Sequence, residues 1–165
     1  MNQVRSRVRT LRAHLSSPAD VWLALRIATW ALIIPVLKTA MPLSRLVRLM
    51  YRPARGGGRQ VEREERIARF VDWVHRPFVR ADKGCLQRSL LAYRFLSEAN
   101  AEPRLHVGVQ QRAGTVHGHA WISVDGRPVG DSEVSVNSFT SVATFGRGGA
   151  LTRHATCEER DTSAA

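Results

Sequence analysis

The chain has 165 residues, 44% of them hydrophobic and 24% charged, which suits one folded domain with a modest core. The formal net charge of +11 lies almost entirely in residues 1–60, which hold eleven Arg or Lys against the single acid Asp20. We do not expect a nucleic-acid-binding protein, because no basic cluster is interleaved with aromatic residues as a base-stacking surface would be.

Residues 1–58 are basic and apolar, and we predict that they are helical. The segment SPAD, residues 17–20, starts a helix with a capping Ser, a Pro in the first helical position and an acid where a capping box needs one. The apolar run Val21–Leu37 is about as long as a membrane span, but Arg26 interrupts it. We predict a buried helix that stops or kinks at Pro35, in a cytoplasmic protein, with peripheral membrane contact as the alternative.

A folded core is predicted over residues 59–147. A second short helix, Pro42–Tyr51, and a glycine linker at residues 56–58 precede it. Apolar residues at helical spacing then predict two longer helices, Val61–His75 and Leu86–Ser97.

The second half of the core alternates apolar and polar residues, as strands do. Leu105–Val109 is a predicted strand, Gln111–Gly118 a predicted loop, and Gly118–Asp131 (GHAWISVDGRPVGD) two strands around a turn. Residues 148–165 have little to bury and are predicted to be a disordered tail. Helices followed by strands indicate the α+β class, with the Cys85 helix packed on one face of a small antiparallel sheet.

Cys85 follows Gly84 and directly precedes the last predicted helix. The helix dipole and the unpaired backbone N–H groups there lower the pKa of a thiol, which favours the nucleophilic thiolate. A buried, unreactive cysteine is the alternative. The second cysteine, Cys157, lies in the predicted tail with no base nearby. Two distant thiols make no disulfide framework, and no CxxC or HxxxH spacing indicates zinc, so we expect neither metal nor cofactor.

A cysteine nucleophile needs an imidazole base and a group that orients it, and His119 and Asp131 of the hairpin are the right residue types. A three-residue loop, Val124–Gly126, would place them opposite each other. A two-residue loop, Asp125-Gly126, would turn Asp131 to the other face of the sheet. The pair can therefore meet if the loop is odd in length, as the three-residue loop is, or if it is bulged. His117, which shares the face of His119, is the rival base.

Five stretches within residues 80–131 carry a resemblance to a known family: CLQRSL at 85–90, LHVGV at 105–109, GHAW at 118–121, Asp125-Gly126, and Asp131. In combination they resemble the transglutaminase-like leader peptidases of lasso-peptide biosynthesis. The chain is similar in particular to the stand-alone peptidase half of the split B protein. Gln87 departs from the family, which often has proline at that position.

The resemblance implies a transglutaminase-like or papain-like cysteine peptidase core, with Cys85 as nucleophile, His119 as base and Asp131 as its orienter. It also implies that the protein removes the leader from a ribosomally made precursor peptide. A separate recognition protein would present the leader, and an ATP-dependent cyclase would close the ring. Residues 1–60 are too short and too apolar for a recognition domain, which favours the split form. Two alternatives stay open: another transglutaminase-like acyl-transfer enzyme, and a non-enzymatic peripheral membrane or scaffold protein.

Overall fold

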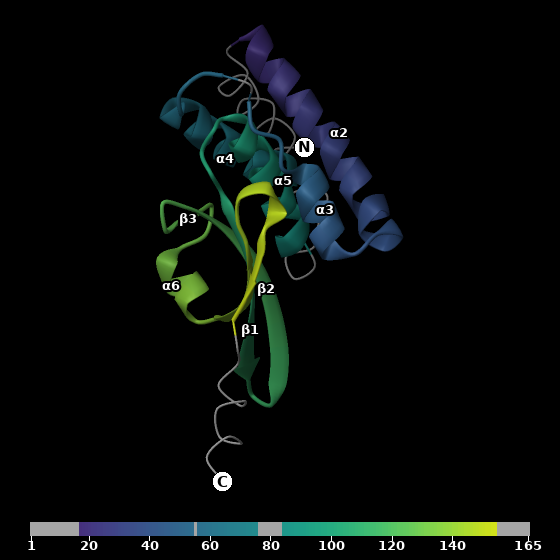
Figure 1. The fold of residues 1–165 in the computed structure, drawn as a ribbon, viewed down its shortest axis with the longest axis vertical. Helices are drawn as coiled ribbons and strands as arrows, with labels where there is room; N and C mark the ends of the chain where they lie inside the picture. Colours follow the sequence, from purple (N-terminus) through teal and green to yellow (C-terminus); the bar gives the residue numbers. More distant parts are fainter. Residues whose placement is uncertain (1–16, 55, 76–83, 155–165) are drawn as a thin grey trace, which may run out of the picture.

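The computed structural model describes residues 17–54, 56–75 and 84–154. Within them, helices come first and strands follow, so the predicted α+β class is confirmed (Figure 1). The helices are α2 Pro18–Ala40, α3 Leu43–Met50, α4 Val61–His75 and α5 Cys85–Glu98. The remaining elements are β1 Arg104–Arg112, β2 Thr115–Val124, β3 Arg127–Val129, α6 Glu133–Asn137, β4 Thr140–Phe145, the 3₁₀ turn Arg147–Gly149 and β5 Leu151–Arg153.

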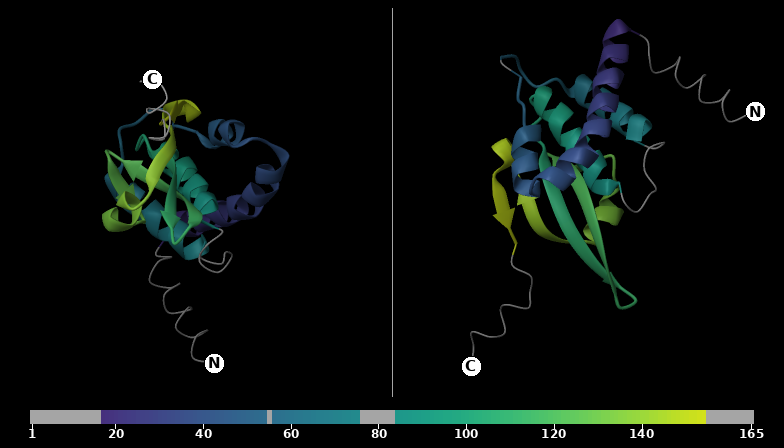
Figure 2. Two further views of the ribbon diagram at one scale, coloured as in Figure 1. Left: turned by 90° about the horizontal axis from the view of Figure 1, so that it is seen from below. Right: turned by 90° about the vertical axis from the view of Figure 1, so that its right-hand side faces the viewer.

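The strands form one antiparallel sheet in the order β3-β2-β1-β4-β5, and helices α2 to α5 lie on one side of it, with α5 against the sheet (Figures 1 and 2). The β1–β2 hairpin extends beyond the helices, because its strands continue through the segment predicted as a loop. They end in a two-residue turn, Ala113-Gly114, where both residues have positive φ (50° and 76°). That conformation matches the twist of the flanking strands, so the predicted loop at Gln111–Gly118 is wrong.

Helix α2 begins as the sequence predicts and ends later. Ser17 and Asp20 form a full capping box: the Ser17 hydroxyl accepts from the Asp20 N–H at 3.2 Å, and the Asp20 carboxylate accepts from the Ser17 N–H at 3.1 Å. The helix does not stop at Pro35, one of the two outcomes predicted for it, but continues to Ala40. Proline has no N–H for the carbonyl four residues earlier, here that of Ala31. The buried Gln87 side chain of α5 donates to that carbonyl at 2.6 Å and replaces the missing bond.

One hydrophobic core joins all four long helices to the sheet, including α2 and α3 from the predicted N-terminal region. Its largest fully buried side chains are Ile27 and Ile34 of α2, Leu46 and Met50 of α3, Ile67 of α4, Leu90, Leu91, Tyr93, Phe95 and Leu96 of α5, Leu105 of β1 and Ile122 of β2. The prediction that α2 is buried holds for one face only. Its other face is exposed along the outside of the helical layer (Figure 2).

The sheet continues into the segment predicted as a disordered tail. Strand β5 pairs with β4, with Leu151 opposite Phe145. The Tyr93 hydroxyl of α5 accepts from the N–H of Gly149 at 3.2 Å and donates to the carbonyl of Gly146. Residues 148–154 are therefore part of the fold. The rest of that tail, with Cys157, lies outside the described residues, as do residues 1–16.

Candidate active site

Cys85 is the first residue of α5, and its thiol is partly exposed. Gly84 precedes it as the N-cap. Because glycine has no side chain that could cap the helix, the first backbone N–H groups of α5 have no side-chain acceptor at the N-cap beside the thiol. The neighbouring His119 imidazole lowers the pKa of Cys85 from 9.0, against the opposing effect of burial. The backbone N–H groups of Ala120 and Leu86 lower it further. The thiolate is thus favoured, as expected at a helix N-terminus.

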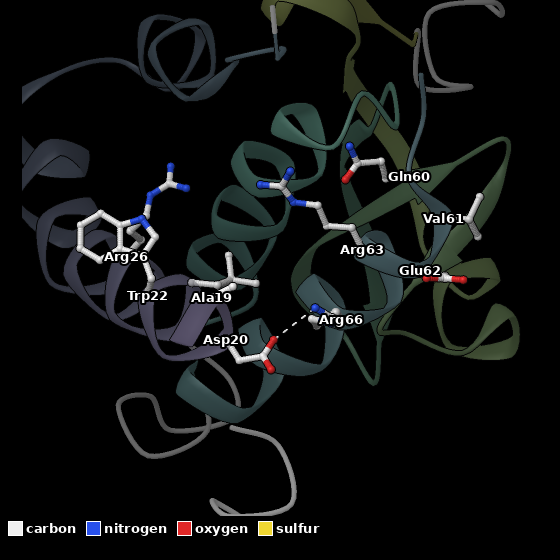
Figure 3. A pocket seen from close by; sticks show the side chains of 10 residues that line it. Ala19, Asp20, Trp22, Arg26, Gln60, Val61, Glu62, Arg63 and Arg66 are labelled. Carbon is white, nitrogen blue, oxygen red and sulfur yellow. Dashed lines mark hydrogen bonds and ion pairs between the residues drawn. The ribbon is translucent and has the colours of Figure 1, made fainter. Parts of the chain in front are cut away.

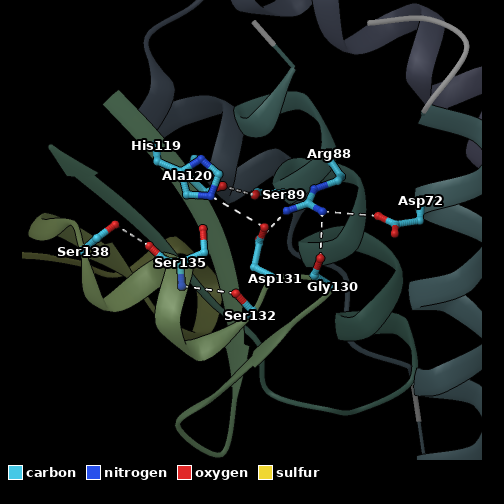
Figure 4. Close-up of polar contacts among 10 residues, drawn as sticks. All are labelled: Asp72, Arg88, Ser89, His119, Ala120, Gly130, Asp131, Ser132, Ser135 and Ser138. Atoms are coloured by element: carbon cyan, nitrogen blue, oxygen red, sulfur yellow. Dashed lines mark hydrogen bonds and ion pairs between the residues drawn. The ribbon is translucent and has the colours of Figure 1, made fainter. Parts of the chain in front are cut away.

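His119 lies on β2, on the strand beside the thiol, and its side chain is 20% exposed. Two aromatic rings flank the imidazole: Trp121 at 6.1 Å and Phe139 at 5.0 Å between ring centroids. Its Nε2 faces Oδ1 of Asp131 at 3.7 Å, an ion-pair contact slightly too long for a hydrogen bond (Figure 4). The Asp131 carboxylate is the main reason that the pKa of His119 is raised to about 9, with Cys85 second and burial opposing both.

The hairpin that carries these residues has a different register from the one that a three-residue loop would give. Val124 pairs with Arg127, which leaves a two-residue loop at Asp125-Gly126 with both φ values positive (52° and 79°). The three-residue loop therefore does not form, because Asp125 adopts the left-handed conformation that a two-residue turn requires.

Asp131 nevertheless lies beside His119. Strand β3 ends at Val129, and Gly130 has a φ of +79°, which takes the chain out of the extended conformation before Asp131. The alternation of faces along a strand therefore ends before Asp131 and does not decide on which side of the sheet its carboxylate lies.

Arg88 holds Asp131 in this position. Its guanidinium pairs with Oδ2 of Asp131, and it also donates to the Gly130 carbonyl at 3.0 Å and to Asp72 of α4 at 3.3 Å (Figure 4). Burial would raise the pKa of the Asp131 carboxyl, but His119 and Arg88 outweigh it and lower that pKa. The carboxylate is thus held ionised, with one oxygen on Arg88 and the other toward His119.

Sequence reasoning gave no role to Arg88, Asp72 or Phe139. A signal existed for Arg88, which stands three residues after Cys85 and so on the same side of the helix, within the motif CLQRSL. For Asp72 there was no such signal in the sequence, apart from its position outside the apolar face of α4. Phe139 follows α6, a helix that the sequence did not predict.

The rival histidines stand apart from Asp131. His117 is exposed and pairs with Gln110 further out on the β1–β2 hairpin. His106 is hydrogen-bonded on both ring nitrogens, to Thr144 at 3.0 Å and Ser123 at 2.8 Å. Both of these histidines are thus accounted for by the sheet.

Gly108 of β1 lies directly across from His119. A β-carbon at Gly108 would meet the Trp121 ring at 2.8 Å and the Thr140 carbonyl at 2.9 Å. Only glycine fits where β4 and the Trp121 ring close in from both sides, which explains this residue of the motif LHVGV.

A cavity of about 380 Å³ opens beside these aromatic rings, between the sheet and α6. Its walls combine aromatic and polar side chains: Arg104, His106, Trp121, Ser123, Glu133 and Phe139. A larger cavity of about 800 Å³ lies elsewhere, between the first turns of α2 and α4, and contains none of the three predicted site residues (Figure 3). Across residues 17–54, 56–75 and 84–154, no three His, Cys, Asp or Glu side chains gather as metal ligands do.

The arrangement supplies what acyl chemistry requires: a thiol of lowered pKa, an imidazole that can take and return its proton, and a carboxylate behind the imidazole. Comparison with known families agrees with this chemistry. The family model Transglut_core3, transglutaminase-like superfamily, matches residues 23–144, well over half of the chain. No curated protein and no solved structure matches the chain.

Proposed function

Because the chain belongs to the transglutaminase-like superfamily, we propose that it is a cysteine peptidase that removes the leader from a ribosomally made lasso-peptide precursor. The superfamily implies cysteine acyl transfer or peptidase activity, and the substrate is inferred from the motifs at residues 85–90, 105–109 and 118–131. The observation that carries the proposal is the thiol of Cys85 at the start of α5, next to His119, which itself faces Asp131.

In the proposed acylation step, the Cys85 thiolate attacks the carbonyl carbon of the last leader residue and an S–C bond forms. The first N–H groups of α5, which have no helical acceptor, can donate to the oxyanion. When the intermediate collapses, the C–N bond breaks. The His119 imidazolium gives its proton to the departing amine, which leaves as the new N-terminus of the core peptide.

In the proposed deacylation step, water attacks the thioester and His119 takes the water proton. The S–C bond breaks, the leader leaves as a carboxylic acid that loses its proton to water, and the Cys85 thiolate faces a protonated His119 again. Asp131 stays ionised throughout and stabilises the imidazolium. The high pKa of His119, about 9, favours this ion-paired resting state.

The 380 Å³ cavity is the proposed subsite for a side chain of the peptide. It shares Trp121 and Phe139 with the surroundings of the His119 imidazole, so a peptide on the thiol could place a neighbouring residue in it. Its mixture of aromatic walls with Arg104 and Glu133 suits an amphipathic side chain.

We further propose that a separate recognition protein presents the leader and that an ATP-dependent cyclase consumes the freed core peptide. The reaction that follows must use the new amine, because cleavage creates it. These partners rest on the resemblance of residues 80–131 to the split family.

The test is incubation of the chain with a precursor peptide, with and without a recognition protein, and mass spectrometry of the products. We expect poor cleavage by the chain alone and a faster rate with the recognition protein, giving a leader with a free carboxylate. A leader joined to an added amine would identify an acyl-transfer enzyme instead. No cleavage in either mixture would contradict the peptidase.

A further inference from the structure

The outer face of α2 is apolar from Val21 to Val36. Its exposed residues recur at helical spacing, and three of them, Trp22, Leu32 and Val36, are 62%, 64% and 65% exposed. We call this face the α2 stripe, and its members are Val21, Trp22, Leu25, Thr29, Leu32, Ile33 and Val36. A continuous apolar stripe of this kind on the surface of a protein marks a site of contact with another molecule or with a membrane.

The α2 stripe could be removed from water at little cost in lost hydrogen bonds. It contains no charged side chain, and Thr29 is its one polar member. The Thr29 hydroxyl donates to the Leu25 carbonyl at 2.9 Å, so it needs no partner outside the helix. Just beyond the stripe, the Thr39 hydroxyl is satisfied in the same way by the Val36 carbonyl at 2.8 Å. Covering this face would therefore leave neither hydroxyl unpaired, and the one other side-chain donor of the stripe is the indole N–H of Trp22, at the end near Arg63.

The opposite face of α2 fixes how the helix can meet an apolar medium. By length and composition, α2 is the one helix among the described residues that could cross a membrane. However, Leu23, Ile27 and Ile34 are buried in the protein core, and Arg26 is paired with Glu98 of α5 at 2.7 Å. A helix held to its own domain on one side can lie in the interface but cannot span the bilayer.

Cations lie near both ends of α2. At its N-terminal end, Trp22 borders the 800 Å³ cavity, whose walls also hold Arg26, Arg63 and Arg66 (Figure 3). Arg66 is paired with Asp20 at 3.3 Å, whereas Arg63 has no ion-pair partner within the part of the chain that the structure describes. Lys38 is exposed in the last turn of α2. Residues 1–60 as a whole hold eleven Arg or Lys against one acid.

We propose that the α2 stripe docks on an anionic phospholipid surface, with the stripe among the acyl chains and lipid headgroups at the cavity lined by Arg63. An apolar helical face flanked by cations, with an exposed tryptophan, is the pattern of an interfacial helix. The charge argues for anionic lipid over a second copy of the chain, because two copies of a chain with net charge +11 repel each other, whereas an anionic surface attracts it. The inference does not depend on the peptidase activity.

The test is co-sedimentation of the full chain with vesicles of phosphatidylcholine alone or mixed with phosphatidylglycerol. We expect binding to the mixed vesicles, weaker binding to the neutral ones, and a loss of the difference at high salt. The stripe variant replaces four exposed residues by serine and should bind about tenfold more weakly or worse. Its substitutions are Trp22→Ser, Leu25→Ser, Leu32→Ser and Val36→Ser. A double variant, Val116→Ser and Val134→Ser, removes exposed apolar residues elsewhere and should bind as the wild type does.

A charge variant keeps the test decisive if the stripe variant does not fold. Arg63→Glu with Lys38→Glu should reduce binding to the mixed vesicles to the level seen with neutral ones. The proposal is overturned if the wild type binds neither kind of vesicle, or if the stripe variant binds as well as the wild type. It is also overturned if light scattering shows a dimer that only the stripe variant loses. Selective loss of binding to a recognition protein, with vesicle binding intact, would identify the stripe as a protein interface instead.

Discussion

The carboxylate of Asp131 is expected to control the charge state of the cysteine–histidine pair, and Asp131→Asn tests this most finely. The change keeps the shape of the side chain and removes its charge. Asp131 is the main cause of the rise in the pKa of His119 from 6.5 to about 9, a difference worth about 3 kcal/mol. His119 is one-fifth exposed and Cys85 shares the shift, so roughly half of this energy, or ~1.5 kcal/mol, is assigned to Asp131. That energy corresponds to about a tenfold drop in the population of the thiolate–imidazolium pair. The imidazole also loses the group that positions it, so we expect the rate of cleavage to fall by about ten- to a thousandfold.

The pH dependence of Cys85 alkylation measures the same effect of Asp131 on the charge state of the Cys85–His119 pair, and it needs no substrate. In the wild type, the thiolate–imidazolium pair exists between the lowered pKa of Cys85 and the pKa of His119, about 9. In Asp131→Asn the pKa of His119 falls, so the alkaline limit of the ion pair moves down. The thiolate then loses its cation at a lower pH, so alkylation slows by up to about tenfold between that lowered limit and pH 9, whereas labelling near pH 6, where the imidazolium persists in both proteins, changes little.

The assay is the rate of iodoacetamide labelling of Cys85, measured against pH in a Cys157→Ala background. Asp125→Asn is the matched control. It removes a carboxylate from the same hairpin that pairs with Arg59, and asparagine tolerates the positive φ of that turn position. The reasoning is refuted if Asp131→Asn labels with the wild-type pH profile, or if Asp125→Asn shifts the profile equally.

Three further predictions concern the neighbours of this pair. His119→Ala should lower cleavage by about 10²–10⁴-fold while His117→Ala keeps most of it, and the reverse result in a peptide assay would move the base to His117. Arg88→Leu should lower kcat by about ten- to a hundredfold, because Asp131 loses the guanidinium that holds its carboxylate, and Arg88→Lys should restore part of the lost kcat. Equal activity of the leucine variant and the wild type would exclude this positioning role of Arg88. Gly108→Ala should lower the free energy of unfolding by about 1–3 kcal/mol, since its methyl group would meet the Trp121 ring and a β4 carbonyl. Gly118→Ala, where a β-carbon meets nothing within 4 Å, is the control in the same denaturant titration, and equal stability of the two variants would contradict the crowding at Gly108.

The sequence predicted the elements whose causes are local. The capping box at Ser17, the apolar spacing of α4 and the position of Cys85 at a helix start all depend on residues within one or two turns. Helix α4 was predicted with both of its ends, Val61 and His75, because its apolar residues keep strict helical spacing to the last turn.

The errors arose where a distant residue decides the local structure. Nothing near Pro35 shows that α2 continues, because the compensating hydrogen bond comes from Gln87, more than fifty residues away. The meeting of His119 and Asp131 was predicted from a loop that does not form. Gly130 ends the strand and Arg88 fixes the carboxylate, and neither effect follows from alternation along a hairpin. Pairing of β5 with β4 likewise adds order to a segment whose own composition suggests none.

The central claim is that the Cys85 thiolate forms the acyl intermediate, and the most direct test is leader release by Cys85→Ala. The alanine side chain fits wherever the small thiol does, so the variant should fold and still bind precursor. With the recognition protein present, mass spectrometry should detect free leader from the wild type and from Cys157→Ala, and none from Cys85→Ala. Leader release by a folded Cys85→Ala at a rate near that of the wild type would contradict the claim.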